Sequence, residues 1–378
     1  MKLTIDPSPP IYRKPLYFDY IVEGLKYLVT SQNADGSWGK KNLSTFRKIY
    51  YTTQVVQCLL RAGFPLNSRI IQNALSYLDN YRQPDIENRA VFFLYLPLGR
   101  LSEDELRNYL ELLKEVQRDD GTFMYEIRDL EKEEEEITMD EWPRVRRGIY
   151  VFYTLHALHF LSMIDEQKYK NLTSLKNEIW NPAWQWLFKE LEREEVKKPR
   201  YTLRDPYTNE ADPELTSYGL ALLHKIGYQI PRFPEVIKWL LNKQVEGSWL
   251  YSCKATSFVI MDLCTLSFDN SLLQLVKKAV EEAMKWLVKN KEKWEKNPNL
   301  TALAISALIS GNIFLNPNFQ EAFFVNYTET LRKEIMEREK QIRKAKRKTK
   351  IQNTIYFILG IVIPLIIEYL IIPALFIP

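Results

Sequence analysis

One short turn occurs three times in this chain of 378 residues, in the segments QNADGSW (32–38), QRDDGTF (117–123) and QVEGSW (244–249). Each copy starts with Gln, turns on an acidic residue and a glycine, and reaches an aromatic residue five or six positions after the Gln. Glycine supplies the positive φ of a tight turn after a helix, and a carboxylate can accept hydrogen bonds from the amides of the turn. The Gln side chain can bind a neighbouring segment. The shared positions are Gln32, Asp35, Gly36 and Trp38, then Gln117, Asp120, Gly121 and Phe123, then Gln244, Gly247 and Trp249.

Hydrophobic periodicity between these turns predicts pairs of helices, in which the first helix ends at such a turn and the second begins near a Thr. Six pairs would close a ring over residues 1–316, although the second, fourth and sixth pairs lack a clear turn of this kind. The expected pairs open near Phe18, Ile70, Glu105, Ser174, Pro234 and Ser271. The second helices are dense in apolar and small residues, as an inner ring requires; they are expected at Tyr51–Ala62, Gly148–Leu161, Pro213–Ile226, Ala255–Leu266 and Asn299–Leu308.

These turns resemble the QW motif of the terpenoid cyclase and protein prenyltransferase superfamily. The resemblance implies an all-α fold, the α/α toroid, with an inner and an outer ring of helices around a central cavity. It indicates little about activity, because the same toroid carries cyclases, prenyltransferases and complement-like domains with a thioester.

Residues 317–378 have a different character from the repeats. Residues 317–350 are predicted to form a charged linker helix, and the next segment, from Thr354 to Phe376, is apolar apart from Glu368. As a helix it is about 34 Å long, enough to cross a bilayer, so residues 351–378 are predicted to be a C-terminal transmembrane anchor. Two prolines in the segment leave a kinked interfacial hairpin as an alternative, and a buried helix of the fold is another.

A basic cluster lies immediately before the predicted anchor. Seven basic residues and no acidic ones fall between Lys340 and Lys350, and subtracting them from the net charge of +4 leaves −3 for the remainder. By the positive-inside rule the ring is expected in the cytoplasm, and the cluster suits anionic lipids. No nucleic-acid recognition module accompanies it, so nucleic acid is not an expected partner. Three cysteines give no disulfide framework, which fits a reducing compartment.

The segment from Asp212 to Thr216 resembles the acidic motif of class II terpenoid cyclases. Those enzymes protonate an alkene with an Asp of Asp-x-Asp-Asp-Thr at the start of an inner helix. In this chain Glu214 stands where the donor would be, and a leucine replaces the second Asp. The resemblance makes Glu214 and Asp212 candidate catalytic residues and Thr216 and Tyr218 candidate cavity residues. The same residues also suit a plain helix start, with Asp212 as the cap and Glu214 near the positive end of the dipole.

A zinc site of the prenyltransferase kind is not expected. Those enzymes use Asp-x-Cys at an inner-helix start and a later His; here Cys253 has Tyr251 in place of the Asp, and no His follows. Cys253 therefore stays a candidate cavity residue and no metal is predicted. Asp262 and Cys264 also form Asp-x-Cys, but their spacing predicts nearly opposite helix faces.

Two other features have open interpretations. His156 and His159, three residues apart, share a helix face and could hold a metal, shuttle protons, or simply pack with hydrogen bonds. The acidic run Glu131–Glu136 is expected to be solvated, with magnesium as an alternative if the substrate is a diphosphate. No other cofactor is expected.

Two functions remain open. The first is a membrane-anchored toroid that binds or transforms a polyprenyl lipid in its cavity. The second is a non-catalytic scaffold for a lipid, a lipidated peptide or a protein at the membrane, with Glu368 marking a membrane-protein partner.

Overall fold

The computed structural model describes residues 16–85, 87–123, 150–193, 200–204 and 210–316. The chain divides into two compact units, Met1–Gln320 and Glu321–Pro378, and every described residue belongs to the first. The regular elements of the described residues are helices, apart from isolated bridges, which confirms the predicted all-α class. The predicted linker helix, the basic cluster, the membrane anchor with Glu368 and the acidic run Glu131–Glu136 lie outside the described residues.

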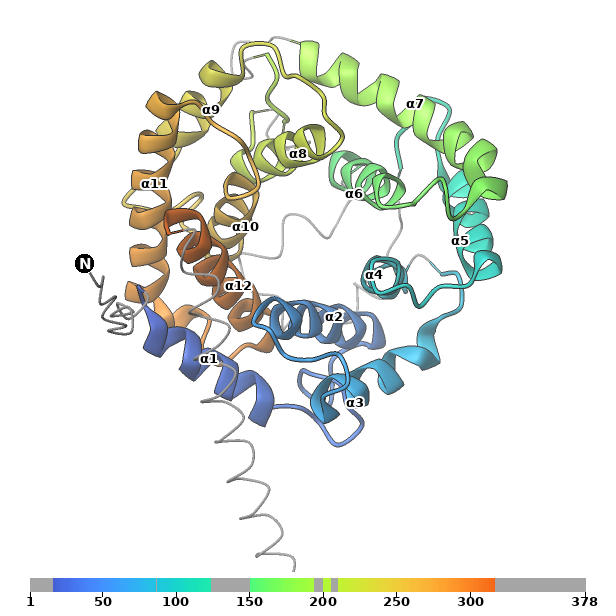
Figure 1. Cartoon of the computed structure of the whole chain (residues 1–378), viewed down its shortest axis with the longest axis horizontal. Helices are drawn as coiled ribbons and strands as arrows, with labels where there is room; N and C mark the ends of the chain where they lie inside the picture. The colour runs from blue at the N-terminus through green and yellow to red at the C-terminus, as the bar shows by residue number, and fades with distance from the viewer. Residues whose placement is uncertain (1–15, 86, 124–149, 194–199, 205–209, 317–378) are drawn as a thin grey trace, which may run out of the picture. The chain divides into compact units, whose positions relative to one another are not determined.

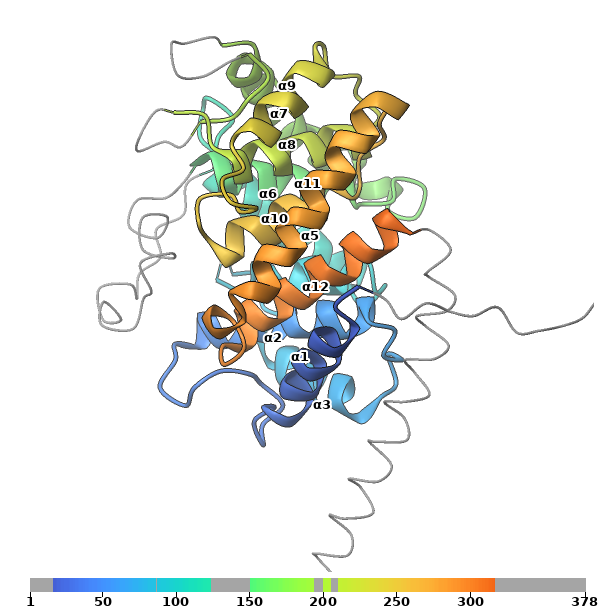
Figure 2. The ribbon, with the colours of Figure 1, turned by 90° about the vertical axis from the view of Figure 1, so that its left-hand side faces the viewer.

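The described helices form two concentric layers, with the odd-numbered helices outside and the even-numbered helices inside (Figure 1). Figure 2 shows α11 running along the outside of α10 and α12, both of which it contacts. The outer helices are α1 (Phe18–Thr30), α3 (Arg69–Leu78), α5 (Glu103–Val116), α7 (Thr173–Glu192), α9 (Phe233–Asn242) and α11 (Asn270–Lys289). The inner helices are α2 (Thr45–Arg61), α4 (Arg89–Tyr95), α6 (Tyr150–Ser162), α8 (Pro213–Lys225), α10 (Cys253–Leu263) and α12 (Pro298–Leu315).

Neighbouring inner helices contact one another around the ring. Backbone contacts join α2 to α4, α6 to α8, α8 to α10, α10 to α12 and α12 back to α2. Between α4 and α6 the link is made by side chains, with the rings of Phe93 and His156 5.2 Å apart. The inner helices therefore enclose a central space.

Helix α12 shows why the inner helices are apolar on most sides. It packs against α1 and α11 outside and against α2 and α10 beside it, so most of its faces are covered. Its length and hydropathy are those of a membrane span, yet 67% of it is buried inside the fold. In this position α12 is a core helix.

The Gln side chains of the three repeated turns make matching hydrogen bonds. Each Nε2 donates to the carbonyl of the glycine in its own turn and to a carbonyl of the next outer helix. The second acceptor is Ile70 in α3 at 2.9 Å for Gln32, Ile179 in α7 at 2.8 Å for Gln117, and Ala279 in α11 at 2.9 Å for Gln244. Each turn therefore ties one helical pair to the next.

The acidic and glycine positions complete these turns. Asp35 accepts a 2.9 Å bond from the amide of Ser37, and Asp120 accepts a 3.0 Å bond from the amide of Thr122. Gly121 has a φ of +88°, and a Cβ there would collide with the carbonyl of Pro182 in the next outer helix. Glycine is needed at this turn both for its backbone conformation and for the close approach of the helix.

Candidate functional site

A cavity of about 840 Å³ lies inside the ring and is lined by residues of all six inner helices. The lining positions of one helix are spaced by three or four residues, as for Phe46, Tyr50, Gln54, Gln57 and Arg61 of α2, so each helix turns one face inward. The volume falls in the range of about 300–1,000 Å³ typical of small-molecule sites. Nine aromatic side chains line it: Phe46, Tyr50, Tyr51, Phe93, Phe152, Tyr153, Tyr218, Phe258 and Phe314.

Charged groups also line this cavity. The guanidinium of Arg89 lies over the rings of Phe46 at 5.1 Å and Tyr153 at 5.0 Å, and so joins α4 to α2 and α6 by cation–π contacts. The other basic lining residues are Arg47, Arg61, Lys225 and Lys254, and the carboxylic acids are Glu214 and Asp262. The cavity can thus take a ligand that is mainly apolar but carries polar atoms.

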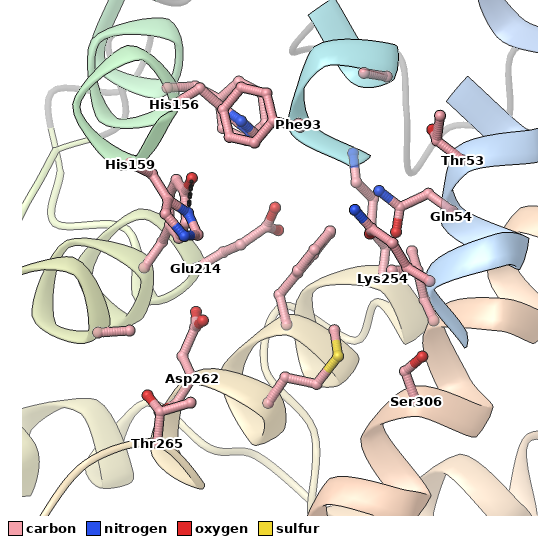
Figure 3. Close-up of a pocket in the computed structure, with 18 of the residues that line it drawn as sticks. Thr53, Gln54, Phe93, His156, His159, Glu214, Lys254, Asp262, Thr265 and Ser306 are labelled. Carbon is pink, nitrogen blue, oxygen red and sulfur yellow. Dashed lines mark hydrogen bonds between the residues drawn. The ribbon is translucent and has the colours of Figure 1, made fainter. Parts of the chain in front are cut away.

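Residues of the segment from Asp212 to Thr216 have two different roles: Asp212 and Thr216 bind backbone amides, and Glu214 lines the cavity. Asp212 is the N-cap of α8, and its carboxylate accepts a 2.8 Å bond from the amide of Leu215. Thr216 Oγ1 accepts a 2.9 Å bond from the amide of Leu203. Neither residue is part of the cavity lining, and backbone amides hold both side chains. Glu214 does line the cavity (Figure 3).

Asp262, near the end of α10, supplies the second carboxyl group. Figure 3 shows it directed into the cavity from the helix next to that of Glu214. Ser217 Oγ donates a 2.8 Å hydrogen bond to its Oδ2. Burial raises the pKa of Asp262 to about 7, and the negative charge of Glu214 adds to this rise, while the Ser217 bond and the Arg61 charge oppose it.

The sequence interpretation missed Asp262 as a cavity residue. It placed Asp262 and Cys264 on opposite helix faces, whereas both line the cavity. The reason is that α10 ends at Leu263, so Cys264 lies beyond the regular helix. The available signal was that Asp262 carries the one carboxyl group in the sequence of α10.

His156 and His159 lie on the face of α6 that lines the cavity, as their spacing predicts. His159 Nδ1 is 2.9 Å from Tyr218 Oη, and the His156 ring packs against Phe152 at 4.2 Å and Tyr218 at 5.2 Å. Burial lowers the pKa of His159 to about 4, with a further contribution from Lys225, and burial also lowers the pKa of His156. These lowered pKa values favour neutral imidazoles at neutral pH, with His156 packed among aromatic rings and His159 hydrogen-bonded to Tyr218.

Cys253 is the first residue of α10, is buried, and does not line the cavity. Among the described residues, no three His, Cys, Asp or Glu side chains gather in a group that could hold a metal ion.

No protein-family model matches this sequence, and no curated protein sequence matches it. Among solved structures, two variants of the type II terpene cyclase MstE from Scytonema, each in complex with geranylgeranyl dihydroxybenzoate, are similar to this chain. For both, the TM-score is 0.48 and the sequence identity 12%, with 79% of this chain and 97% of that chain covered.

Proposed function

We propose that the ring is an α/α toroid of the terpenoid cyclase and prenyltransferase type, and that its cavity binds a polyprenyl lipid. The observation that carries this proposal is the aromatic lining contributed by all six inner helices around about 840 Å³. An isoprenoid chain offers few hydrogen bonds, so its affinity has to come from apolar area removed from water, at about 25 cal/mol per Å². Aromatic faces supply such area without flexible side chains that must be ordered.

Catalysis within this proposal would be initiated by a proton from a carboxylic acid of the cavity, with Glu214 as the candidate. The π electrons of an alkene would form the new C–H bond while the O–H bond of the acid breaks and leaves a carboxylate. The aromatic faces would stabilise the carbocation. Loss of a proton from a neighbouring carbon to the carboxylate would restore the acid, so the reaction needs no oxidant or reductant.

A non-catalytic lipid-binding scaffold is the second candidate. The observation that favours it is the state of the acidic segment, in which Asp212 serves as the cap of α8 and Thr216 binds a backbone amide. Neither side chain assists Glu214 in the way that the second Asp of the cyclase motif would. In this case the cavity would hold a prenyl lipid or a lipidated peptide without changing it.

The proposal also includes membrane attachment. Residues 351–378 would anchor the chain, the basic cluster Lys340–Lys350 would lie against anionic lipids, and the ring would face the cytoplasm. Glu368 within the apolar segment would contact a membrane-protein partner. An anchored toroid would take its ligand directly from the bilayer.

The test is to incubate the detergent-solubilised chain with C15 to C35 isoprenoids and to measure retained ligand by native mass spectrometry and product by chromatography. Ala221 lines the cavity, so Ala221→Trp should fill it and reduce retention. Leu275, which is 49% exposed on α11, gives the matched control Leu275→Trp. Loss of retention in Ala221→Trp alone supports the site. If wild type retains no isoprenoid, the proposed function is rejected; retained but unchanged ligand selects the scaffold.

A further inference from the structure

Asp262 is a carboxyl group to which neither the family motifs nor the proposed function gives a role. It lies on α10, 45 residues beyond its hydrogen-bond partner Ser217 on α8, so the pair forms only when these inner helices pack together. Figure 3 shows its carboxyl directed into the cavity, as is that of Glu214. Burying a charged carboxylate among aromatic rings costs much more free energy than burying the neutral acid.

Ser217 decides which oxygen of Asp262 faces the ligand. Among the described residues, the hydrogen bond recorded for this carboxyl joins Ser217 Oγ to Oδ2 at 2.8 Å. The same hydroxyl lies 3.0 Å from the carbonyl oxygen of Glu214, so its single proton is shared between this carbonyl and Asp262 Oδ2. Oδ2 is therefore engaged by the wall, and Oδ1 is the oxygen left for a molecule in the cavity.

We propose that Asp262 is a ligand-binding carboxylic acid, which donates a hydrogen bond from Oδ1 to a carbonyl or ether oxygen of the isoprenoid. This inference rests on the proposed function and narrows it, because it makes the ligand an isoprenoid with an oxygen acceptor and not a pure hydrocarbon. A carboxylate could not make this bond, since it has no proton to donate. Ser217 acts as the positioning residue.

Asp262 has titratable neighbours on two other helices and at the end of its own. From α8 these are Glu214 and Tyr218, from α2 Arg61, and from the end of its own helix Cys264. Helix α12 contributes Ser306 and Ser310 to the lining, neither of which is charged. Burial, the largest cause, raises the pKa of Asp262 to about 7 despite Arg61, so the carboxyl changes its charge near physiological pH.

The test compares two probes in the full chain in detergent, the prenyl ketone farnesylacetone and the hydrocarbon farnesene, at pH 6 and pH 8. Because only the neutral acid donates, the ketone should bind about tenfold more weakly at pH 8 than at pH 6. Asp262→Asn keeps a donor without ionising, so the ketone should bind it equally at both pH values. Asp262→Leu should bind the ketone weakly at both values and no better than the hydrocarbon.

A control is needed for His224, because this side chain also lines the cavity. His224→Gln should keep the pH dependence of ketone binding. The inference is overturned if Asp262→Leu binds the ketone as tightly as wild type, if Asp262→Asn keeps the pH dependence, or if His224→Gln removes it. Failure of both probes to bind at either pH would instead reject the proposed function itself, so the two failures are distinguishable.

Discussion

The backbone amide of Trp38 donates a 3.1 Å hydrogen bond to Thr52 Oγ1, which joins the aromatic end of the first turn to the inner helix α2 that follows it. Both residues are fully buried. A buried amide needs such a partner, and a threonine of the next helix provides it. The same bond occurs between Phe123 and Thr154 at 3.1 Å, Leu203 and Thr216 at 2.9 Å, and Trp249 and Thr256 at 3.1 Å.

Thr256→Val should destabilise the fold while keeping the shape of the side chain. It would leave the buried amide of Trp249 without its acceptor, at a cost of about 1–3 kcal/mol. Thr30, whose hydroxyl bonds an exposed carbonyl of α1, provides the control Thr30→Val, with a change within about 0.5 kcal/mol. Urea unfolding of both variants measures the difference in the free energy of unfolding. Equal losses in the two variants would show that the buried turn bond contributes no more stability than the exposed one.

Gly121→Ala should be more damaging than Gly227→Ala, although both glycines have positive φ. The angles are +88° and +77°, so the backbone strain is similar. A Cβ at 227 meets nothing within 4 Å, whereas one at 121 collides with the carbonyl of Pro182. We expect Gly227→Ala to lower the free energy of unfolding by about 1–2 kcal/mol and Gly121→Ala to lower it clearly more, as measured by thermal unfolding. Similar values would mean that α7 moves aside at little cost.

These turns could be predicted from sequence because their chemistry is local. Gln, glycine and an aromatic residue fall within seven positions. The partners of Trp38 lie in the helices before and after its turn, whereas the Gln side chain reaches the next outer helix. Helix α4 (Arg89–Tyr95) was not delimited in advance, because seven residues give too short a period. Trp294 was missed too: its indole bonds the carbonyl of Leu287 at 2.9 Å, as that of Trp249 bonds Leu240 at 2.8 Å, but without a Gln or Gly to mark the turn.

The site was less predictable, because it depends on contacts between helices far apart in the chain. Asp212 and Glu214 are two residues apart and seemed to form one motif, but the first caps α8 and the second enters the cavity. Asp262 becomes part of the site through Ser217 on another helix. No local pattern shows which side of a helix faces the centre of a ring.

Glu214→Gln and Asp212→Asn should separate catalysis from capping. Asn also caps helices well, so Asp212→Asn should keep both stability and any turnover. Glu214→Gln is nearly isosteric but cannot protonate an alkene, so it should abolish turnover of an isoprenoid while ligand retention stays. Product chromatography beside native mass spectrometry makes the comparison. Product that persists in Glu214→Gln would remove Glu214 from the catalytic role.

A chain ending at Lys350 should leave the membrane fraction. It lacks Thr354–Phe376, the segment predicted to span the bilayer, and keeps the basic cluster, whose attraction to lipid is screened by salt. Fractionation with and without a high-salt wash tests this, with the full chain as the control. If the shortened chain stays with membranes after the wash, the anchor is elsewhere.

Asp262→Asn should stabilise the protein at pH 8 and change it little at pH 4. The folded pKa of about 7 lies above the ordinary value of 3.8. The folded state therefore prefers the neutral acid, and this contribution is fully present below pH 3.8 and is lost as the pH rises through 7. The loss at pH 8 is on the order of a few kcal/mol, and the Asn variant, which never ionises, avoids it.

His159 changes the free energy of unfolding with pH in the opposite direction. The pH dependence of wild type alone would therefore hide the contribution of Asp262. Its folded pKa of about 4 lies below 6.5, and its contribution is present above pH 6.5 and is lost as the pH falls through 4. The measurement is therefore the difference in the free energy of unfolding between Asp262→Asn and wild type at each pH from 4 to 8, since the histidine contribution cancels in it. That difference should grow with pH and level off above 7. A difference that stays constant across this range would mean that Asp262 is ionised throughout, with Arg61 as its counter-ion, and that it cannot donate a hydrogen bond in the cavity.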